Sequence, residues 1–242
     1  MYKKLFEGKK AAIFDLDGTI FKEGEAFRKE AFIEVLKDVS LSYIDPVPYC
    51  ISGYTSEEIW KAIIYGNEIK NRNLEELVDK TRRAYVEIVK NKDIQPTEGF
   101  WDLFNELKQE KGYKIGLATS ASKFTQELTM EKLGIKDIFD ATIFGDEIGK
   151  RKPNPEIFKK ILKRLKVRPK ETILFEDSVI GVKAAKKAKI DTIVIWDGET
   201  MKREYGDNAI DFSTDFTQYP GRLDETHEEY LLRSFKEATE SN

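Results

Sequence analysis

Between residues 99 and 196, short apolar runs alternate with segments of helical periodicity, and this alternation constrains the fold more than any other feature. Short runs rich in aliphatic and β-branched residues are typical of buried strands. Strands that alternate with helices predict a parallel sheet with helices on both faces, a Rossmann-like α/β/α architecture of three layers. The expected strands are 113–119, 140–144, 172–175 and 191–196, and the expected helices are 99–111, 123–134, 154–165 and 178–188.

A helical module interrupts this pattern near the N-terminus. One more strand is expected over residues 10–14, whereas residues 21–95 show no strand signal. The sequence therefore predicts a discontinuous α/β core of residues 1–20 and 96–242, with an all-helical module of residues 21–95 inserted after the first strand. A module inserted there lies over the carboxyl edge of the sheet, where a lid can exclude water. Helices are expected at 25–38, 55–66 and 73–92, and a last one at 219–238.

Composition excludes several classes of function. The 41 Lys and Arg residues against 44 Asp and Glu give a net charge of −3, which argues against a nucleic-acid partner. The single cysteine, Cys50, excludes an intramolecular disulfide and favours a cytoplasmic setting, with a packing role for its side chain. The single histidine, His227, is expected on a surface helix and leaves no multi-histidine metal site. No apolar run approaches a membrane span or a signal peptide, and either a monomer or a homodimer is compatible with the sequence.

An acidic pair follows the first predicted strand, in the segment Asp15-Leu16-Asp17-Gly18-Thr19. Side chains alternate across a strand, so the two carboxylates converge only if the chain leaves the sheet here, and Gly18 permits such a turn. Ligands of open α/β sheets bind at the carboxyl ends of the strands. The pair therefore indicates a metal site, a nucleophile or an acid/base pair, although ordinary turn chemistry would also use these residue types.

Polar groups follow three more strands. Ser120 can either hold a phosphate oxygen or cap a helix. Lys152 lies beside a stiff Pro-Asn-Pro segment, and its side chain can point inward or lie in solvent. Glu176-Asp177 form a second acidic pair. Two like charges ~4 Å apart cost about 4 kcal/mol at an effective dielectric near 20. Two acidic pairs at one edge of a sheet thus predict a cation between them, and Mg²⁺ prefers such oxygen ligands.

These segments resemble the motifs of the haloacid dehalogenase superfamily of phosphotransferases. DLDGT matches its first motif, Ser120 in LATSASK the second (with Thr119 as an alternative), Lys152 in KPNPEIF the third, and Glu176-Asp177 in FEDSVIG the fourth. The match extends over residues 10–198, and the helical module is similar to the family's cap. The segments most resemble the β-phosphoglucomutase, sugar-phosphate phosphatase and phosphoglycolate phosphatase branch.

The resemblance implies a role for each residue. Asp15 is implied as the nucleophile that forms an aspartyl-phosphate, and Asp17 as the general acid and base. Asp15, Asp177 and the Asp17 backbone carbonyl are implied as Mg²⁺ ligands, with Glu176 behind them or as a substrate-dependent ligand. Ser120, Ala121 and Lys152 are implied to hold the phosphate, and Lys152 also to orient Asp15. An ordinary Asp is protonated in about one molecule in a thousand at pH 7, so its surroundings must raise the pKa of Asp17.

The resemblance further implies a Mg²⁺-dependent phosphatase of a small phosphorylated metabolite. The segment after Gly53 lacks the basic cap residue of the mutase branch, and Phe27 stands where that branch has a histidine. Both departures favour a phosphatase over the alternative of an intramolecular sugar phosphomutase. A non-catalytic regulatory protein on the same fold is the third alternative. Substrate selection is then assigned to the cap, chiefly Tyr54 and Thr55, with Trp60 and Lys22 as further candidates.

Overall fold

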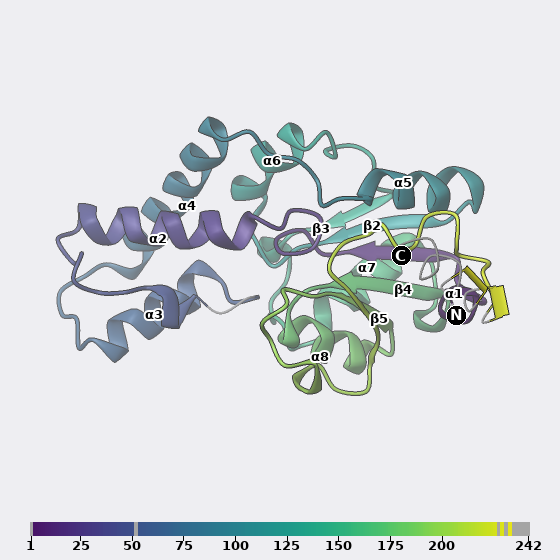
Figure 1. The fold of residues 1–242 in the computed structure, drawn as a ribbon. Helices are drawn as coiled ribbons and strands as arrows, with labels where there is room; N and C mark the ends of the chain where they lie inside the picture. The colour runs from purple at the N-terminus through teal and green to yellow at the C-terminus, as the bar shows by residue number, and fades with distance from the viewer. Residues whose placement is uncertain (1, 51–52, 227, 230–231, 234–242) are drawn as a thin grey trace, which may run out of the picture.

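Six parallel strands form one sheet in the order β3-β2-β1-β4-β5-β6 in the computed structural model of this chain (Figure 1). The structure describes residues 2–50, 53–226, 228–229 and 232–233. The strands are β1 (Ala11–Phe14), β2 (Lys114–Ala118), β3 (Ala141–Ile143), β4 (Thr172–Glu176), β5 (Asp191–Ile195) and β6 (Ala209–Ser213). The α-helices are α1 (Tyr2–Phe6), α2 (Gly24–Asp38), α3 (Ser56–Gly66), α4 (Leu74–Asn91), α5 (Phe100–Asn105), α6 (Lys123–Lys132), α7 (Glu156–Leu165) and α8 (Val179–Ala188).

The sheet is buried on both faces, which explains why its strands are apolar throughout rather than alternating. Along β1, Ala12 and Phe14 pack toward α5 and α6, whereas Ile13 packs toward α7 and α8. Phe14 stacks on Phe175 of the neighbouring strand β4, with ring centroids 4.7 Å apart. The predicted three-layer α/β/α fold with a parallel sheet is thus confirmed.

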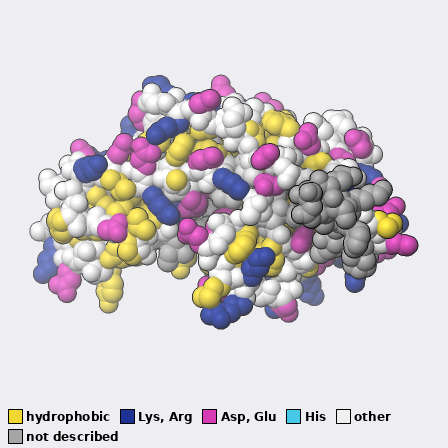
Figure 2. Space-filling model, viewed as in Figure 1, with side chains coloured by type: hydrophobic (Ala, Val, Ile, Leu, Met, Phe, Trp, Pro, Cys, Tyr) yellow, Lys and Arg dark blue, Asp and Glu magenta, His cyan; other side chains and the backbone are white. Residues whose placement is uncertain are grey.

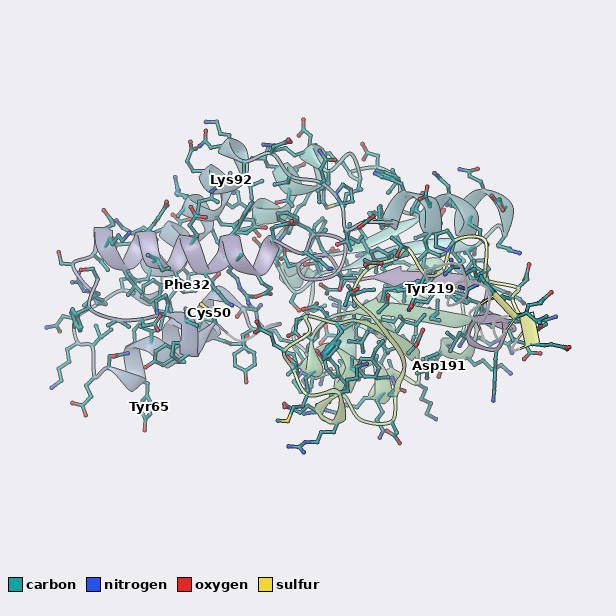
Figure 3. All side chains as sticks on the ribbon, viewed as in Figure 1. Phe32, Cys50, Tyr65, Lys92, Asp191 and Tyr219 are labelled. Atoms are coloured by element: carbon teal, nitrogen blue, oxygen red, sulfur yellow. The ribbon has the colours of Figure 1, made fainter. Side chains whose placement is uncertain are left out.

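Helices α2, α3 and α4 form a helical lobe beside the carboxyl end of β1 (Figure 1). The lobe has its own apolar core, in which Cys50 is buried with Phe32, as Figure 3 shows. The two connections to the α/β part lie side by side, because Thr97 N–H donates to the Ile20 carbonyl at 2.7 Å. The second half of α4 also packs against the sheet's core, so this helix joins the two parts.

Some predicted elements differ from the structure. Strand β6 was not expected, since it pairs on one edge only and most of it is half-buried, without a strong apolar pattern. The helix expected over 99–111 becomes a π-helical turn at Glu106–Glu110. Residues 219–226 form turns rather than the start of a last helix; residues 228–229 and 232–233 are helical, and the rest of that prediction, with His227, lies outside the described residues.

The viewed face carries acidic and basic side chains interspersed with one another, as expected for a chain of 35% charged residues (Figure 2). Within the part of the chain that the structure describes, no helix is long and apolar enough to cross a membrane.

Candidate active site

The chain leaves the sheet directly after Asp15, as the Asp-x-Asp-Gly sequence predicts. Asp15 N–H still donates to the Phe175 carbonyl of β4 at 2.9 Å, and the chain then folds back so that Phe21 N–H donates to the Leu16 carbonyl at 2.9 Å. Gly18 has φ of +86°, and a Cβ atom there would lie 2.3 Å from Asp177 Oδ2. Glycine is therefore required both by the backbone and by the close approach of Asp177.

Three carboxylates from two strand ends meet beside this turn. Asp15 from β1 and Glu176 and Asp177 from β4 each offer an oxygen within 4.8 Å of the others. The ammonium of Lys152 lies among them, with Nζ 2.6 Å from Asp15 Oδ1 and 2.7 Å from Glu176 Oε2. Lys152 and its two partners are all buried, and the Lys152 side chain is only 1% exposed. The sequence left two positions open for Lys152, in solvent or in the site, and the structure shows the inward one.

The electrostatics of this cluster favour an added positive charge. Burial and the adjacent Glu176 carboxylate raise the pKa of Asp15, although Lys152 opposes them. Burial alone would lower the pKa of Lys152, but the Asp15 and Glu176 carboxylates together raise it, so this side chain stays charged. One ammonium cannot neutralise three carboxylates, and the remaining negative charge is what a hard divalent cation would compensate.

Asp17 lies apart from this cluster but lines the same cavity. Its carboxylate accepts hydrogen bonds from Gln126 Nε2 at 2.6 Å and from the Tyr85 hydroxyl at 3.3 Å. Burial, and secondly the charge of Glu25, raise the pKa of Asp17 to about 7. The surroundings thus bring the pKa of the Asp17 carboxyl close to neutral pH, as a general acid and base requires.

The loop after β2 presents a free hydroxyl to the cavity. Ser122 caps helix α6 by accepting from Thr125 N–H, so capping does not occupy Ser120. The Ser120 hydroxyl is buried and has no hydrogen-bond partner among the described residues. The alternative, Thr119, uses its hydroxyl to accept from Ala121 N–H at 3.2 Å, which also engages the Ala121 amide. Ser120 is therefore the better placed of the two hydroxyls to hold a phosphate oxygen.

Asp177 does not cap the helix that follows it. Ser178 caps α8 by accepting from Gly181 N–H at 3.0 Å, and it donates to Glu176 Oε1 at 2.5 Å. Asp177 instead accepts from the Thr19 hydroxyl at 3.3 Å, which ties the fourth motif to the first.

The helical lobe supplies the other wall of the cavity. Tyr54 and Thr55 line it as expected, although the Thr55 hydroxyl is occupied in a capping box with Glu58. Trp60 was wrongly assigned to the cavity, because it is fully buried in the lobe's core, where its indole N–H donates to Thr81. Lys22 is exposed and does not line the cavity either.

Several polar side chains of the cavity were not found from the sequence. Arg28 from α2 donates to the Tyr54 carbonyl at 2.6 Å and pairs with Glu25, and both line the cavity. Arg82 from α4 and Arg151 line it as well. The absence of an arginine after Gly53 therefore does not leave this side without positive charge. The spacing of Glu25 and Arg28 is also that of any solvated helix face, so no sequence signal distinguished them from surface residues.

Together the cavity holds a cluster of three carboxylates with an inward lysine, a separate carboxylate with a pKa near neutral, and a hydroxyl without a partner among the described residues, all at the carboxyl edge of a parallel sheet. Such a site on an α/β fold defines an enzyme with groups suited to nucleophilic attack and proton transfer. The chain belongs to the haloacid dehalogenase-like hydrolase family, whose model matches residues 12–195.

Relatives support this assignment. The chain is 31% identical over 186 residues to the phosphorylated carbohydrates phosphatase of Thermotoga maritima, covering 76% of this chain and 83% of that protein. It is 30% identical over 199 residues to the β-phosphoglucomutase of Bacillus subtilis, covering 79% and 85%. The crystal structure of β-phosphoglucomutase from Clostridium difficile shares the fold, with a TM-score of 0.74, 24% identity, and coverage of 93% and 99%. The family and the enzyme class expected from the sequence motifs are thus confirmed.

Proposed function

We propose that this chain is a Mg²⁺-dependent phosphatase of a small phosphorylated sugar or related metabolite, acting through an aspartyl-phosphate at Asp15. The observation that carries the proposal is the convergence of Asp15, Lys152, Glu176 and Asp177 with the free Ser120 hydroxyl on one cavity. The similarity to a phosphorylated carbohydrates phosphatase supports the substrate class.

The donor set fits Mg²⁺. Carboxylate oxygens of Asp15 and Asp177 lie close together, and no nitrogen or sulfur ligand from histidine or cysteine accompanies them among the described lining residues. We assign Asp15, Asp177 and the Asp17 backbone carbonyl as ligands, with Glu176 held behind them by Lys152 and Ser178. A bound Mg²⁺ would neutralise charge on the transferring phosphoryl group.

In the first step an Asp15 carboxylate oxygen attacks phosphorus, and the bond from phosphorus to the substrate oxygen breaks. Lys152 keeps Asp15 oriented through its 2.6 Å contact and offsets the negative charge that opposes the approach of two anions. Ser120 donates its hydroxyl proton to a phosphoryl oxygen. Asp17 gives its proton to the departing alkoxide, so the leaving group is a neutral alcohol.

In the second step a water molecule attacks phosphorus of the aspartyl-phosphate. Asp17, now ionised, takes the proton from this water, the acyl-phosphate bond breaks, and Asp15 returns as a carboxylate with release of inorganic phosphate. A pKa of about 7 lets Asp17 serve both steps near neutral pH, because neither protonation state is rare there.

The helical lobe closes the cavity opposite Asp15, and we assign it as the cap that excludes water. One observation keeps the mutase alternative open. Arg82 lines the cavity from α4, is half-buried, and acts electrostatically on Glu57 of α3. Such a cation would suit a second phosphate group, as a sugar phosphomutase needs.

A screen of sugar phosphates, nucleotides and phosphoglycolate, with and without Mg²⁺, tests the proposal. We expect release of inorganic phosphate that requires Mg²⁺ and is lost in Asp15→Asn. Conversion of a hexose 1-phosphate to a 6-phosphate without phosphate release would favour the mutase instead. A chain that neither turns over nor binds any of these compounds would contradict both and favour the regulatory alternative.

A further inference from the structure

The carboxylate of Asp17 is held by side chains from two different parts of the molecule. Gln126 from α6 of the α/β part donates to Oδ2 at 2.6 Å, and Tyr85 from α4 of the helical lobe donates to Oδ1 at 3.3 Å. Both side chains are buried, Gln126 with 1% and Tyr85 with 5% of its surface exposed. Each carboxylate oxygen therefore has a partner that is itself fixed by packing.

The backbone on the remaining side restricts Asp17 further. Helix α2 begins at Gly24, and a Cβ atom there would lie 2.4 Å from Asp17 Oδ1 and 3.1 Å from its Cβ. The first turn of α2 thus approaches the carboxylate as closely as a glycine allows. Glu25 and Arg28 near the start of the same helix are charged neighbours that act on Asp17 electrostatically.

We propose that Tyr85 and Gln126 are positioning residues that hold the Asp17 carboxylate in the orientation needed for proton transfer to the leaving group. The inference rests on the proposed phosphatase function and adds to it two residues outside the four family motifs. We call these two side chains the clamp. Because Tyr85 belongs to the helical lobe, the clamp makes correct placement of Asp17 depend on that lobe being docked.

The chemistry of the two side chains suits this task. A hydroxyl and a primary amide can each donate or accept a hydrogen bond. They can therefore stay bonded to Asp17 after it gives up or takes a proton, if the hydroxyl turns or the amide rotates. A lysine or arginine at either position would donate only, and would favour the ionised carboxylate alone.

The test uses leaving groups of different acidity. Phenyl phosphate and p-nitrophenyl phosphate have similar shapes, but phenol is a weak acid with a pKa of about 10, like tyrosine, whereas the nitro group stabilises the departing phenolate. The ratio kcat/KM reports steps up to transfer of phosphorus to Asp15, so hydrolysis of the intermediate does not enter. Misplacement of a general acid then affects phenyl phosphate far more than its nitro derivative.

The variants are Tyr85→Phe and Gln126→Met, which keep ring and chain length but remove the donors. We expect kcat/KM for phenyl phosphate to fall by about 10- to 100-fold, with a smaller loss for p-nitrophenyl phosphate and the larger effect at Gln126, whose bond is shorter. Tyr113→Phe is the matched control, because its buried hydroxyl contacts the Phe6 carbonyl far from the site. This control should leave both substrates unchanged.

Equal losses on both substrates, or no loss, would overturn the clamp. If the Gln126 variant fails to fold, as judged by thermal unfolding, Tyr85→Phe alone decides the same question. In an Asp17→Asn background, a working clamp predicts no further change in kcat/KM for p-nitrophenyl phosphate, whereas an additional loss contradicts it. Failure of the proposed function is distinguishable, because then the wild-type chain itself hydrolyses neither substrate in the presence of Mg²⁺.

Discussion

Replacing Lys152 with Met removes the ammonium that joins Asp15 and Glu176. The Lys152 side chain is 1% exposed, and its two partners are 8% and 1% exposed, so water cannot take over its contacts. Asp15 and Glu176 are then left without the cation that they share. The variant therefore tests whether the acidic cluster is as strongly coupled as its geometry indicates.

The expected loss is large. Breaking a buried ion pair by truncating one partner costs about 3–5 kcal/mol. In a chain of this size one kcal/mol lowers the melting temperature by about 2–4 °C, so a decrease of about 6–20 °C is expected in EDTA at pH 8. At pH 5 the deficit should shrink, because the raised pKa of Asp15 lets it take up a proton that relieves the repulsion.

Thermal unfolding followed by circular dichroism at both pH values measures this effect. Lys80→Met is the matched control, because Lys80 pairs with Asp38 at the surface and its loss should barely change the midpoint. Added Mg²⁺ should recover part of the loss in the Lys152 variant. A Lys152→Met protein as stable as the wild type in EDTA at pH 8 would refute the electrostatic reasoning.

Three further predictions concern single groups. Burial raises the pKa of Asp17 to about 7, so its stabilising contribution is full below pH 4 and is lost as the pH rises through 7. The free energy of unfolding of the wild type, measured by urea titration, should therefore fall relative to that of Asp17→Asn between pH 4 and 8. A rise over the same range would contradict this prediction. Ser120→Ala should weaken inhibition by inorganic phosphate about tenfold without lowering the melting temperature, because its hydroxyl has no partner among the described residues; an unchanged inhibition constant argues against its phosphate role. Mg²⁺ should raise the melting temperature of the wild type more than that of Asp177→Asn, and equal shifts would remove Asp177 from the ligand set.

The parts of the site that depend on topology were predictable from the sequence. Asp15 and Glu176-Asp177 follow apolar strands, and parallel strands bring their carboxyl ends to one edge whatever the details of packing. Lys152 could be placed there only with the other motifs, because its own segment is compatible with a solvated turn. The sequence alone left Ser120 between a helix cap and a phosphate ligand, and the structure excludes the cap because Thr125 N–H donates to Ser122 instead.

The residues that depend on helix packing could not be predicted. Tyr85 and Gln126 reach Asp17 because α4 and α6 dock against the same edge, and amphipathic periodicity does not reveal which turn of a helix faces a cavity. Trp60 shows the converse error, since an aromatic residue on an amphipathic helix belongs to the lobe's core. Strand β6 was missed because an edge strand with one neighbour needs no continuous apolar run.

Trapping the intermediate tests the central claim most directly, namely that Asp15 carries the phosphoryl group and Asp17 serves its hydrolysis. Asp17→Asn incubated with Mg²⁺ and p-nitrophenyl phosphate should accumulate one phosphoryl group per chain. The p-nitrophenolate leaving group needs little protonation, whereas attack of water on the aspartyl-phosphate needs the base that this variant lacks. Mass spectrometry of the rapidly quenched protein should locate this group on the peptide that contains Asp15. Phosphorylation elsewhere, or unimpaired release of phosphate by Asp17→Asn without any bound phosphoryl group, would contradict the account.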